Sequence, residues 1–525
     1  MLVSASDSSL FVGDSAYLSA TVLTTKRSGK SSTSTAVTWS SSDTSVVRIV
    51  GRYARGVRAG AAILMATAAS CSNSVPVTVA DKPPVVVPTP PPTTAKQLPL
   101  TLQWLDRSVA TPVASNGIPL PAGYLFERDL PSVALTDGTQ EIARVLTPLA
   151  GRYADGSLRA VLLQFRADPT KTALQLNIGT THSLADPAPW PIPSPLPQAV
   201  AYPASPAFLV STQLVGPTIT VAENPGATYE SQFQTFSDKH WLAEGAQWDQ
   251  ANYYDRALSH FTYWMRSGNL LYWQRAVALA LNYRTQYIEA NAYGPSPHWM
   301  LLEGLAAHYW LTGDTLSRTA VIKSIARVWQ GFTPTNMADP NYAYIEGRIQ
   351  ARMMIGSLLA WELGDTGQDW KALTTAYKNN MITLQRADGS YAWPNWCGHQ
   401  ANFMVGMQND AMIKYYERIQ ADPAIITTIR KSVDYMSQVA WRPLQQGFSY
   451  MDIPCLPTDD MSPMFDLNML IVTGYAFTGA KTGQRSYIAT ADSIASGAMT
   501  SSWLDGSKQF NQQYYDSHQW LWYRK

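Results

Sequence analysis

The sequence lacks any apolar run of about 18 residues, the length that a membrane-spanning helix needs. Its first residues, Met1-Leu-Val-Ser-Ala-Ser-Asp7, also lack the basic stretch and apolar run of a secretory signal. We therefore expect a soluble protein with no membrane insertion. An extracellular location would then require a signal removed from this chain, or release by cell lysis as part of a phage particle.

An excess of charge of one sign is also missing. The chain has 39 Lys and Arg residues against 38 Asp and Glu residues, so no basic field exists to hold nucleic acid or an acidic membrane. Charged residues make up only 15%, whereas 18 Trp and 27 Tyr are present. Such rings can stack on sugars. Core packing accounts for most of them, and carbohydrate contact is the functional interpretation for the exposed remainder.

Cysteine is scarce, and the three residues Cys71, Cys397 and Cys455 do not have the spacing of a metal site. Only Cys397 and Cys455 could form a disulfide within one domain. Phosphate loops, nucleotide fingerprints, nucleophile elbows and zinc motifs are absent from the sequence. We expect no metal and no resident cofactor; a calcium ion bridging to a uronate stays open.

The length of 525 residues predicts about three domains. Residues 1–80 contain short apolar runs separated by turn residues, which predicts a small β-sandwich. Residues 81–97 are proline-rich and predict an extended linker. Residues 98–227 again predict strands, and residues 228–525 show helical periodicity. The predicted fold class is therefore multidomain, with two all-β domains followed by an all-α domain.

The first module carries Val37-Thr-Trp-Ser-Ser-Ser-Asp43, then Val46-Val-Arg-Ile49, then a turn from Gly56 to Gly60. This order resembles the bacterial Ig-like (group 2) fold over nearly the whole module. The resemblance implies an Ig-like sandwich that serves as a spacer or adhesive unit on cell-surface and phage proteins. It thus implies an extracellular, cell-surface or virion location, with assembly through this module.

Residues 98–227 carry Asn116-Gly-Ile-Pro-Leu-Pro-Ala-Gly123, Leu135-Thr-Asp-Gly-Thr-Gln140 and Gly151-Arg-Tyr-Ala-Asp-Gly-Ser-Leu-Arg159. These segments resemble the RIFT-barrel domain of exo-acting rhamnogalacturonan-lyase-like proteins, although Tyr153-Ala154 stands where that family has an aromatic-proline pair. The resemblance implies a barrel-like domain in front of a catalytic one. From the residues alone, both Asp-Gly pairs are hairpin turns.

Four helical segments end on Gly268, Gly313, Gly364 and Gly479, each followed by another helical segment. Where the spacing is clear it is roughly 45 to 50 residues, which predicts one helical hairpin per repeat. An open solenoid would give the same pattern. Aromatic-rich loops and the preceding β domain favour a closed (α/α) toroid, and the Tyr309-Trp-Leu-Thr-Gly-Asp314 turn resembles that of polysaccharide lyases and six-hairpin glycosidases.

Three clusters of polar and aromatic residues interrupt the helical pattern and are candidates for the mouth of this toroid. Their catalytic candidates are His298, Tyr344, Glu346, Asp388, Tyr391 and His399, and their candidates for substrate binding are Trp299, Arg348, Arg352, Trp393, Trp396, Gln400 and Asn402. The alternative is structural: His298 as a packing residue, 386–403 as an Asp-Gly hairpin with an aromatic plug, and the arginines as a salt-bridged face. His308 is expected to be structural, and His518 could reach the mouth.

A lyase acting on uronate-containing polysaccharide needs a cation or amide for the carboxylate, a base for the proton at carbon five and an acid for the leaving oxygen. Arg348 or Arg352 with Asn402 would supply the first. His298 or His399 would be the base, and Tyr344 or Tyr391 the acid; by resemblance, histidine and tyrosine serve these roles in metal-free toroids. We therefore favour β-elimination.

Two alternatives stay open. A glycoside hydrolase needs two carboxyl groups about 5 to 9 Å apart, and its candidates are Asp249, Asp255, Glu303, Glu346, Asp388 and Asp410. No spacing distinguishes a pair among them. A non-catalytic adhesin or virion receptor-binding protein would bind glycan without turnover.

Overall fold

The computed structural model divides the chain into two compact units, Met1–Pro92 and Thr93–Lys525, and each is described by itself. It describes all residues except 6–7, 14, 26–30, 35–36, 52, 69–70, 82–94, 107, 110–111, 250–252, 343–345 and 395–396. Most of the predicted linker 81–97 is therefore outside the described residues. Within the described residues, no helix has the length and apolar character to cross a membrane.

The first unit consists of two sheets, mostly antiparallel, that pack around one apolar core. The strands are β1 (Leu2–Ala5), β2 (Ser9–Phe11), β3 (Ser15–Thr25), β4 (Ser31–Ser34), β5 (Thr38–Ser41), β6 (Val47–Val50), β7 (Tyr53–Gly56), β8 (Gly60–Ala68) and β9 (Cys71–Ala80). One sheet has the order β1-β3-β7-β6 with β4 on β3, and the other has the order β2-β9-β8-β5. Along β8 buried and exposed residues alternate, so Ala62, Leu64 and Ala66 face the core. The two-sheet arrangement agrees with the predicted sandwich, and the bacterial Ig-like kinship stays a prediction.

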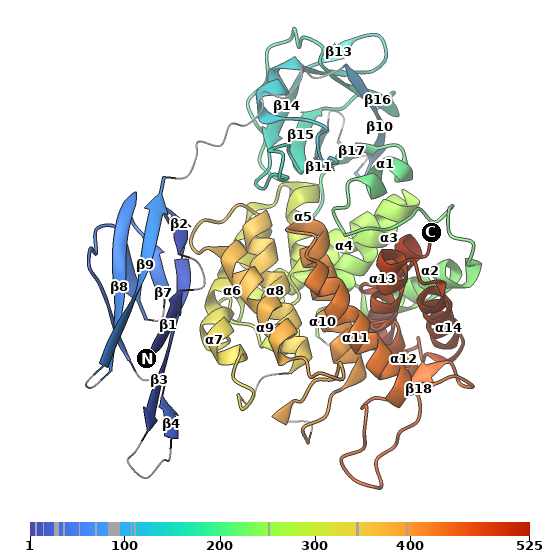
Figure 1. The fold of residues 1–525 in the computed structure, drawn as a ribbon. Helices are drawn as coiled ribbons and strands as arrows, with labels where there is room; N and C mark the ends of the chain where they lie inside the picture. Colours follow the sequence, from blue (N-terminus) through green and yellow to red (C-terminus); the bar gives the residue numbers. More distant parts are fainter. Residues whose placement is uncertain are drawn as a thin grey trace. The chain divides into compact units, whose positions relative to one another are not determined.

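The second unit begins with an eight-stranded sheet that is nearly closed and barrel-like (Figure 1). Its strands, in the order β13-β12-β16-β10-β17-β11-β15-β14, are β13 (Glu141–Ile142), β12 (Val133–Thr136), β16 (Ala173–Ile178), β10 (Lys96–Trp104), β17 (Ala199–Pro203), β11 (Val113–Pro119), β15 (Ala160–Arg166) and β14 (Arg144–Pro148). Strand β15 is buried almost throughout, because one side faces the sheet's own core and the other faces the helices. The structure does not test the RIFT-barrel resemblance.

All-helical structure follows, as predicted, and its helices pair as antiparallel neighbours. After α1 (Pro206–Ser211), the pairs in the described residues are α3 (Arg256–Ser267) with α4 (Leu270–Tyr283), α5 (Glu303–Thr312) with α6 (Thr315–Val328), α8 (Gly347–Glu362) with α9 (Trp370–Leu384), α10 (Asn402–Arg418) with α11 (Pro423–Val439), α13 (Val472–Thr482) with α14 (Arg485–Ser501), and α15 (Ser507–Tyr514) with α2 (Ala227–Glu244). The last helix, α16 (His518–Tyr523), packs on α13. Short helices α7 (Pro334–Met337) and α12 (Phe465–Asn468) lie in the connections.

Contacts between neighbouring pairs arrange them as a ring of inner and outer helices. Inner helices contact one another in the order α3, α5, α8, α10 and α13, and α15 packs against α3 to close the ring. Inner helix α5 is buried on every side, whereas outer helix α11 buries Ile425, Ile429 and Val433 on one stripe. The arrangement is the (α/α) toroid that the hairpin repeat predicted.

Short turns join the inner helices α3, α5, α8, α10 and α13 to their outer partners at one end of the ring. Gly268, Gly313 and Gly364 have positive φ there, as the glycine pattern predicted. The prediction for Gly479 was wrong: α13 continues through it to Thr482 and ends on Gly483, with a φ of 72°. Gly479 is instead buried in the helix, where a Cβ would lie 2.7 Å from Ile488 Cδ1.

The barrel-like sheet covers this short-turn end. Ala150 accepts a hydrogen bond from Trp310 Nε1 at 2.9 Å, and Arg159 pairs with Glu362 at 2.8 Å. Gly117 is so close to α5 that a Cβ would lie 1.9 Å from the Trp310 carbonyl oxygen. The sheet therefore blocks one end of the ring, and the long connections lie at the opposite end.

Candidate active site

The inner helices start at the long-connection end, and carboxylate side chains stand at several of these starts. Asp255 caps α3, Glu303 is the first residue of α5, and Glu346 precedes α8. The unpaired N–H groups of a helix start favour negative charge. This end of the ring therefore combines fixed carboxylates with the long loops.

The structure brings His298, Glu346 and Arg348 together, although 48 residues separate the first two. His298 Nε2 lies 2.6 Å from Glu346 Oε1, and Arg348 donates to the same oxygen at 2.9 Å. Glu346 is 8% exposed and His298 is 36% exposed. Two sequence clusters thus form one site whose histidine is open to solvent.

Electrostatics fix the charge of Glu346. Burial acts to raise its pKa, but the hydrogen bond from His298 and the charge of Arg348 outweigh burial and hold the pKa at about 2. An ionised carboxylate can only accept, so His298 donates from Nε2. Neutral His298 then carries its lone pair on Nδ1, which makes Nδ1 the basic nitrogen.

Tyr253 completes the chain of hydrogen bonds, because Arg348 Nη1 donates to its hydroxyl at 3.0 Å. The ring of Tyr253 packs against Trp299, with centroids 4.5 Å apart. Trp248 in turn meets Trp299 edge-on at 5.9 Å. Trp299 therefore lies in the site as predicted, in an aromatic wall beside the polar groups. Tyr253 was not among the predicted site residues; the signal in the sequence is the triplet Tyr253-Tyr254-Asp255 before a helix.

Arg352 lies one turn of α8 beyond Arg348 and is also at the site. Its Nη1 donates to Pro297 O at 3.3 Å, next to His298, and its guanidinium lies 5.3 Å from the centroid of the Tyr253 ring. Tyr344 and Trp396 are among the residues that the structure does not describe, so their predicted roles stay predictions.

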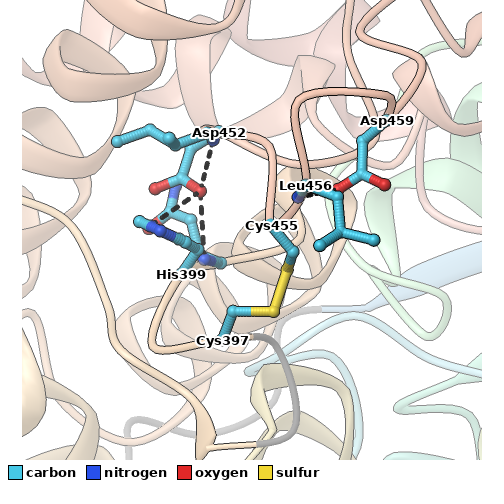
Figure 2. Close-up of a disulfide and its surroundings, with 8 residues drawn as sticks. Cys397, His399, Asp452, Cys455, Leu456 and Asp459 are labelled. Carbon is cyan, nitrogen blue, oxygen red and sulfur yellow. Dashed lines mark hydrogen bonds and ion pairs between the residues drawn. A yellow bond between two sulfur atoms is a disulfide. The ribbon is translucent and has the colours of Figure 1, made fainter.

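His399 occupies a second, neighbouring position. Its side chain is 28% exposed and its Nδ1 lies 3.9 Å from Asp452 Oδ1 (Figure 2). The disulfide between Cys397 and Cys455, which the sequence left open, is present. It ties this loop to the connection that follows the short strands β18 (Trp441–Arg442) and β19 (Gly447–Phe448). Trp393 N donates to His399 O at 3.2 Å, and the Trp393 indole packs against Gly347 at the start of α8.

Four other predicted site residues of this loop have structural contacts. Gln400 is fully buried, and its Oε1 accepts from Tyr391 N at 2.8 Å. Asn402 is equally buried and donates to Ser449 O at 2.8 Å. Tyr391 is 1% exposed and donates to Met381 O, and burial raises its pKa. Trp393 is 2% exposed. These side chains are buried, and their contacts hold the loop against the ring.

Asp388 is likewise a turn residue. Its Oδ1 accepts from Ser390 N at 2.9 Å and from Ser390 Oγ at 2.7 Å. These hydrogen bonds lower its pKa and close the Asp-Gly hairpin. The structural alternative therefore fits Asp388 better than the predicted catalytic role.

Three of the remaining carboxylate candidates, Asp255, Glu303 and Asp410, are buried. Lys414 bridges Glu303 at 2.8 Å and Asp410 at 2.7 Å, so both acids are buried in an ionic cluster. Burial raises the pKa of Asp255 to about 7, against the hydrogen bonds from Gly304 N and Leu258 N. Asp255, Glu303 and Arg352 line one small cavity. Asp249 is exposed, with a φ of 99°.

His308 and His518, the two other histidines considered in the sequence, are buried in the helical part. His308 Nδ1 contacts Ser317 Oγ at 2.8 Å, which agrees with the expected structural role. His518 is 2% exposed and its Nε2 lies 3.1 Å from Val215 O, and burial lowers its pKa to about 3. His518 therefore does not reach the mouth. Within the described residues, no group of three or more His, Cys, Asp or Glu side chains could hold a metal ion.

No family model and no curated protein matches the sequence, and the similar proteins found are solved structures. One similar structure is the unsaturated glucuronyl hydrolase of Bacillus sp. GL1, responsible for the degradation of glycosaminoglycan, with a TM-score of 0.43 and 10% identity over 53% of this chain and 85% of that one. Another is the Lin0763 protein of Listeria innocua, with a TM-score of 0.40 and 11% identity over 55% of this chain and 96% of that one.

Proposed function

We propose that the chain degrades a uronate-containing polysaccharide by β-elimination at the long-connection end of the helical ring. The observation that carries the proposal is the continuous set of contacts from His298 through Glu346 and Arg348 to the hydroxyl of Tyr253. In this proposal the contacts bring together a base, His298, a cation, Arg348, and a hydroxyl acid, Tyr253; the histidine is open to solvent and the tyrosine is buried. These are the three groups that the reaction requires.

In the proposed reaction, His298 Nδ1 removes the proton from carbon five of the uronate. Glu346 stabilises the imidazolium that forms, because its carboxylate already accepts from Nε2. Arg348 and Arg352 neutralise the uronate carboxylate, which makes the carbon acid stronger. The electron pair of the broken C5–H bond forms the C4–C5 double bond, the C4–O bond breaks, and Tyr253 protonates the leaving oxygen.

One observation favours a hydrolase as the second candidate. Glu346 and Asp255 are two carboxyl groups whose environments hold their pKa values at about 2 and about 7. Such a split is what an inverting or retaining glycosidase requires of its base and its acid. In that case Asp255 would protonate the leaving group and Glu346 would act as base or nucleophile.

The test is incubation with a panel of acidic and neutral polysaccharides, with absorbance near 235 nm and reducing ends followed together. A rise in both signals, abolished in His298→Ala, would support β-elimination. Reducing ends without absorbance, abolished in Asp255→Asn, would support the hydrolase instead. Binding without either signal would mean a non-catalytic glycan-binding protein, which is the adhesin alternative.

The location follows as part of the proposal. A protein that acts on polysaccharide would work outside cells, at the cell surface, or on a virion that must penetrate a polysaccharide capsule. The disulfide between Cys397 and Cys455 supports an oxidising environment. Detection of the protein in the medium, the envelope or a particle fraction, against the cytoplasm, tests this.

A further inference from the structure

Lys508 lies at the same site but comes from the opposite end of the chain. Its Nζ is 5.4 Å from the centroid of the Tyr253 ring, and Arg352 is 5.3 Å from the same centroid. Arg348 meets the hydroxyl of that ring at 3.0 Å. Three cations from α8 and α15 therefore surround one tyrosine.

The place of Lys508 is fixed by its own helix. Asn511, three residues further along α15, donates from Nδ2 to the Tyr253 carbonyl oxygen at 2.9 Å. Residues three apart share one helix face, so Asn511 holds Lys508 over the ring. The ring-closing hairpin thus contributes to the site.

The cations are not neutralised within the described residues. Glu346 pairs with Arg348, but neither Arg352 nor Lys508 forms an ion pair in the described part of the chain. The undescribed residues of this unit include no aspartate or glutamate. Two positive charges thus remain beside Tyr253: Arg352 is buried, whereas Lys508 is half-buried, as are Trp299 and Trp248 of the aromatic wall. Two cations over one ring attract an anion, and the carboxylate of a sugar stacked on the aromatic wall carries the matching charge.

We propose that Lys508, with Arg352, forms an anion subsite that selects a charged sugar next to the bond that is cleaved. The inference rests on the proposed function for the identity of the reaction, but the subsite can be tested through binding alone. Lys508 is then a specificity residue: it contacts the substrate carboxylate and does not transfer a proton. Its removal should weaken binding and leave the chemical step almost unchanged.

The experiment measures binding of the full chain to polygalacturonate, alginate, hyaluronan and xanthan by affinity electrophoresis and calorimetry. Each polymer is paired with a form whose uronates have been reduced to neutral sugars. We expect at least one charged polymer to bind about tenfold tighter than its reduced form, and Lys508→Gln to remove most of this difference. Lys508→Arg should retain it, and added salt should weaken wild-type binding more than that of Lys508→Gln.

Lys371→Gln is the matched control, because Lys371 also lies over an aromatic ring, 5.7 Å from Trp361, but at the short-turn end of α9. It should bind like the wild type. Equal binding of charged and reduced polymers, binding of none of the four, or unchanged selectivity in Lys508→Gln would overturn the subsite. Charge-selective binding with no turnover would instead overturn the proposed function and leave the subsite standing. With turnover, Lys508→Gln should raise KM about tenfold and leave kcat within about twofold.

Discussion

Glu346 shows how one side chain couples stability to the candidate chemistry. It is buried, accepts from His298 and Arg348, and has its pKa lowered from an ordinary 4.5 to about 2. Because the folded-state pKa is below the unfolded value, ionised Glu346 stabilises the fold at pH above about 4.5. That contribution is lost as the pH falls from about 4.5 toward 2.

We therefore expect Glu346→Gln to lower the free energy of unfolding by about 2 kcal/mol at pH 7 and by much less near pH 3. The same variant should lower kcat at least about 100-fold, because the glutamine cannot stabilise an imidazolium. Urea unfolding at both pH values and turnover of the best polysaccharide are the measurements.

Glu127→Gln is the control for this pH dependence, since Glu127 forms an ion pair with Arg152 while 60% exposed. Exposed pairs contribute little, so its stability should change by less than about 1 kcal/mol. If Glu346→Gln and the wild type lost stability in parallel between pH 7 and pH 3, the assignment of an ionised, stabilising Glu346 would be wrong.

Residue patterns in the sequence predicted part of this site. His298, Glu346, Arg348 and Trp299 stood out because polar and aromatic residues interrupted a helical pattern, and the structure brings them together. Tyr391 and Trp393 gave the same signal and are instead buried. Local composition does not distinguish an aromatic loop that lines a site from one that is buried against the ring. The difference here is set by the packing of the loop against α8, which the sequence pattern does not contain.

At the scale of elements, the disulfide holds the loop 385–401 in place. Cys397 and Cys455 are 58 residues apart and join two connections on the long-connection side (Figure 2). Asp452, near one cysteine, accepts from Gln400 N at 3.2 Å and from Tyr435 at 2.8 Å. Trp393, in the same loop, packs against Gly347 beside Glu346. Covalent and noncovalent contacts thus connect this loop to the site.

The double variant Cys397→Ser/Cys455→Ser should therefore lose about 2 to 4 kcal/mol of stability, since a loop of this length is no longer closed in the unfolded chain. We expect reductant to lower the Tm of the wild type toward that of the variant and to reduce turnover. Thermal unfolding and kinetics with and without reductant check both.

Cys71→Ser provides the comparison, because Cys71 is free and belongs to the other compact unit. It should leave turnover and its response to reductant unchanged. A double variant as active as the wild type, with the same Tm, would show that the noncovalent contacts of the loop suffice.

Element prediction succeeded where the rule is local. A glycine directly after a helix readily takes a left-handed φ, since it has no Cβ, so Gly268, Gly313 and Gly364 located the hairpin turns. Gly479 misled because it is small for packing against Ile488 rather than for a turn. The pairing of α2 with α15 could not be predicted from the repeat either, because the repeat pairs helices that follow each other in the chain and 262 residues lie between Glu244 and Ser507.

At the scale of the whole molecule, that closing pair makes the ring a single cooperative body. Tyr229 on α2 contacts Ser517 Oγ at 2.7 Å, and Tyr514 donates to the Tyr229 carbonyl oxygen at 2.9 Å. The barrel-like sheet and the helices also belong to one compact unit. Residues 1–92 have a separate core around Leu18, Val47 and Leu64.

Two units with separate cores should unfold and function separately. We expect a chain of residues 93–525 to retain kcat/KM within about twofold on a soluble polysaccharide, because the candidate site and the ring lie entirely in that unit. Calorimetry should show one transition fewer than for the full chain, and kinetics on the same substrate gives the comparison. The variant His298→Ala in the shorter chain controls for residual contaminating activity.

On particles that carry the polysaccharide, the expectation differs. An adhesive or spacer module contributes by keeping the enzyme near its substrate, so the shorter chain should bind such particles more weakly while its rate on soluble polymer is unchanged. A parallel loss on soluble and particulate substrate would mean that residues 1–92 support the catalytic unit itself. Equal binding of both chains to particles would mean that the first unit has no adhesive role in this setting.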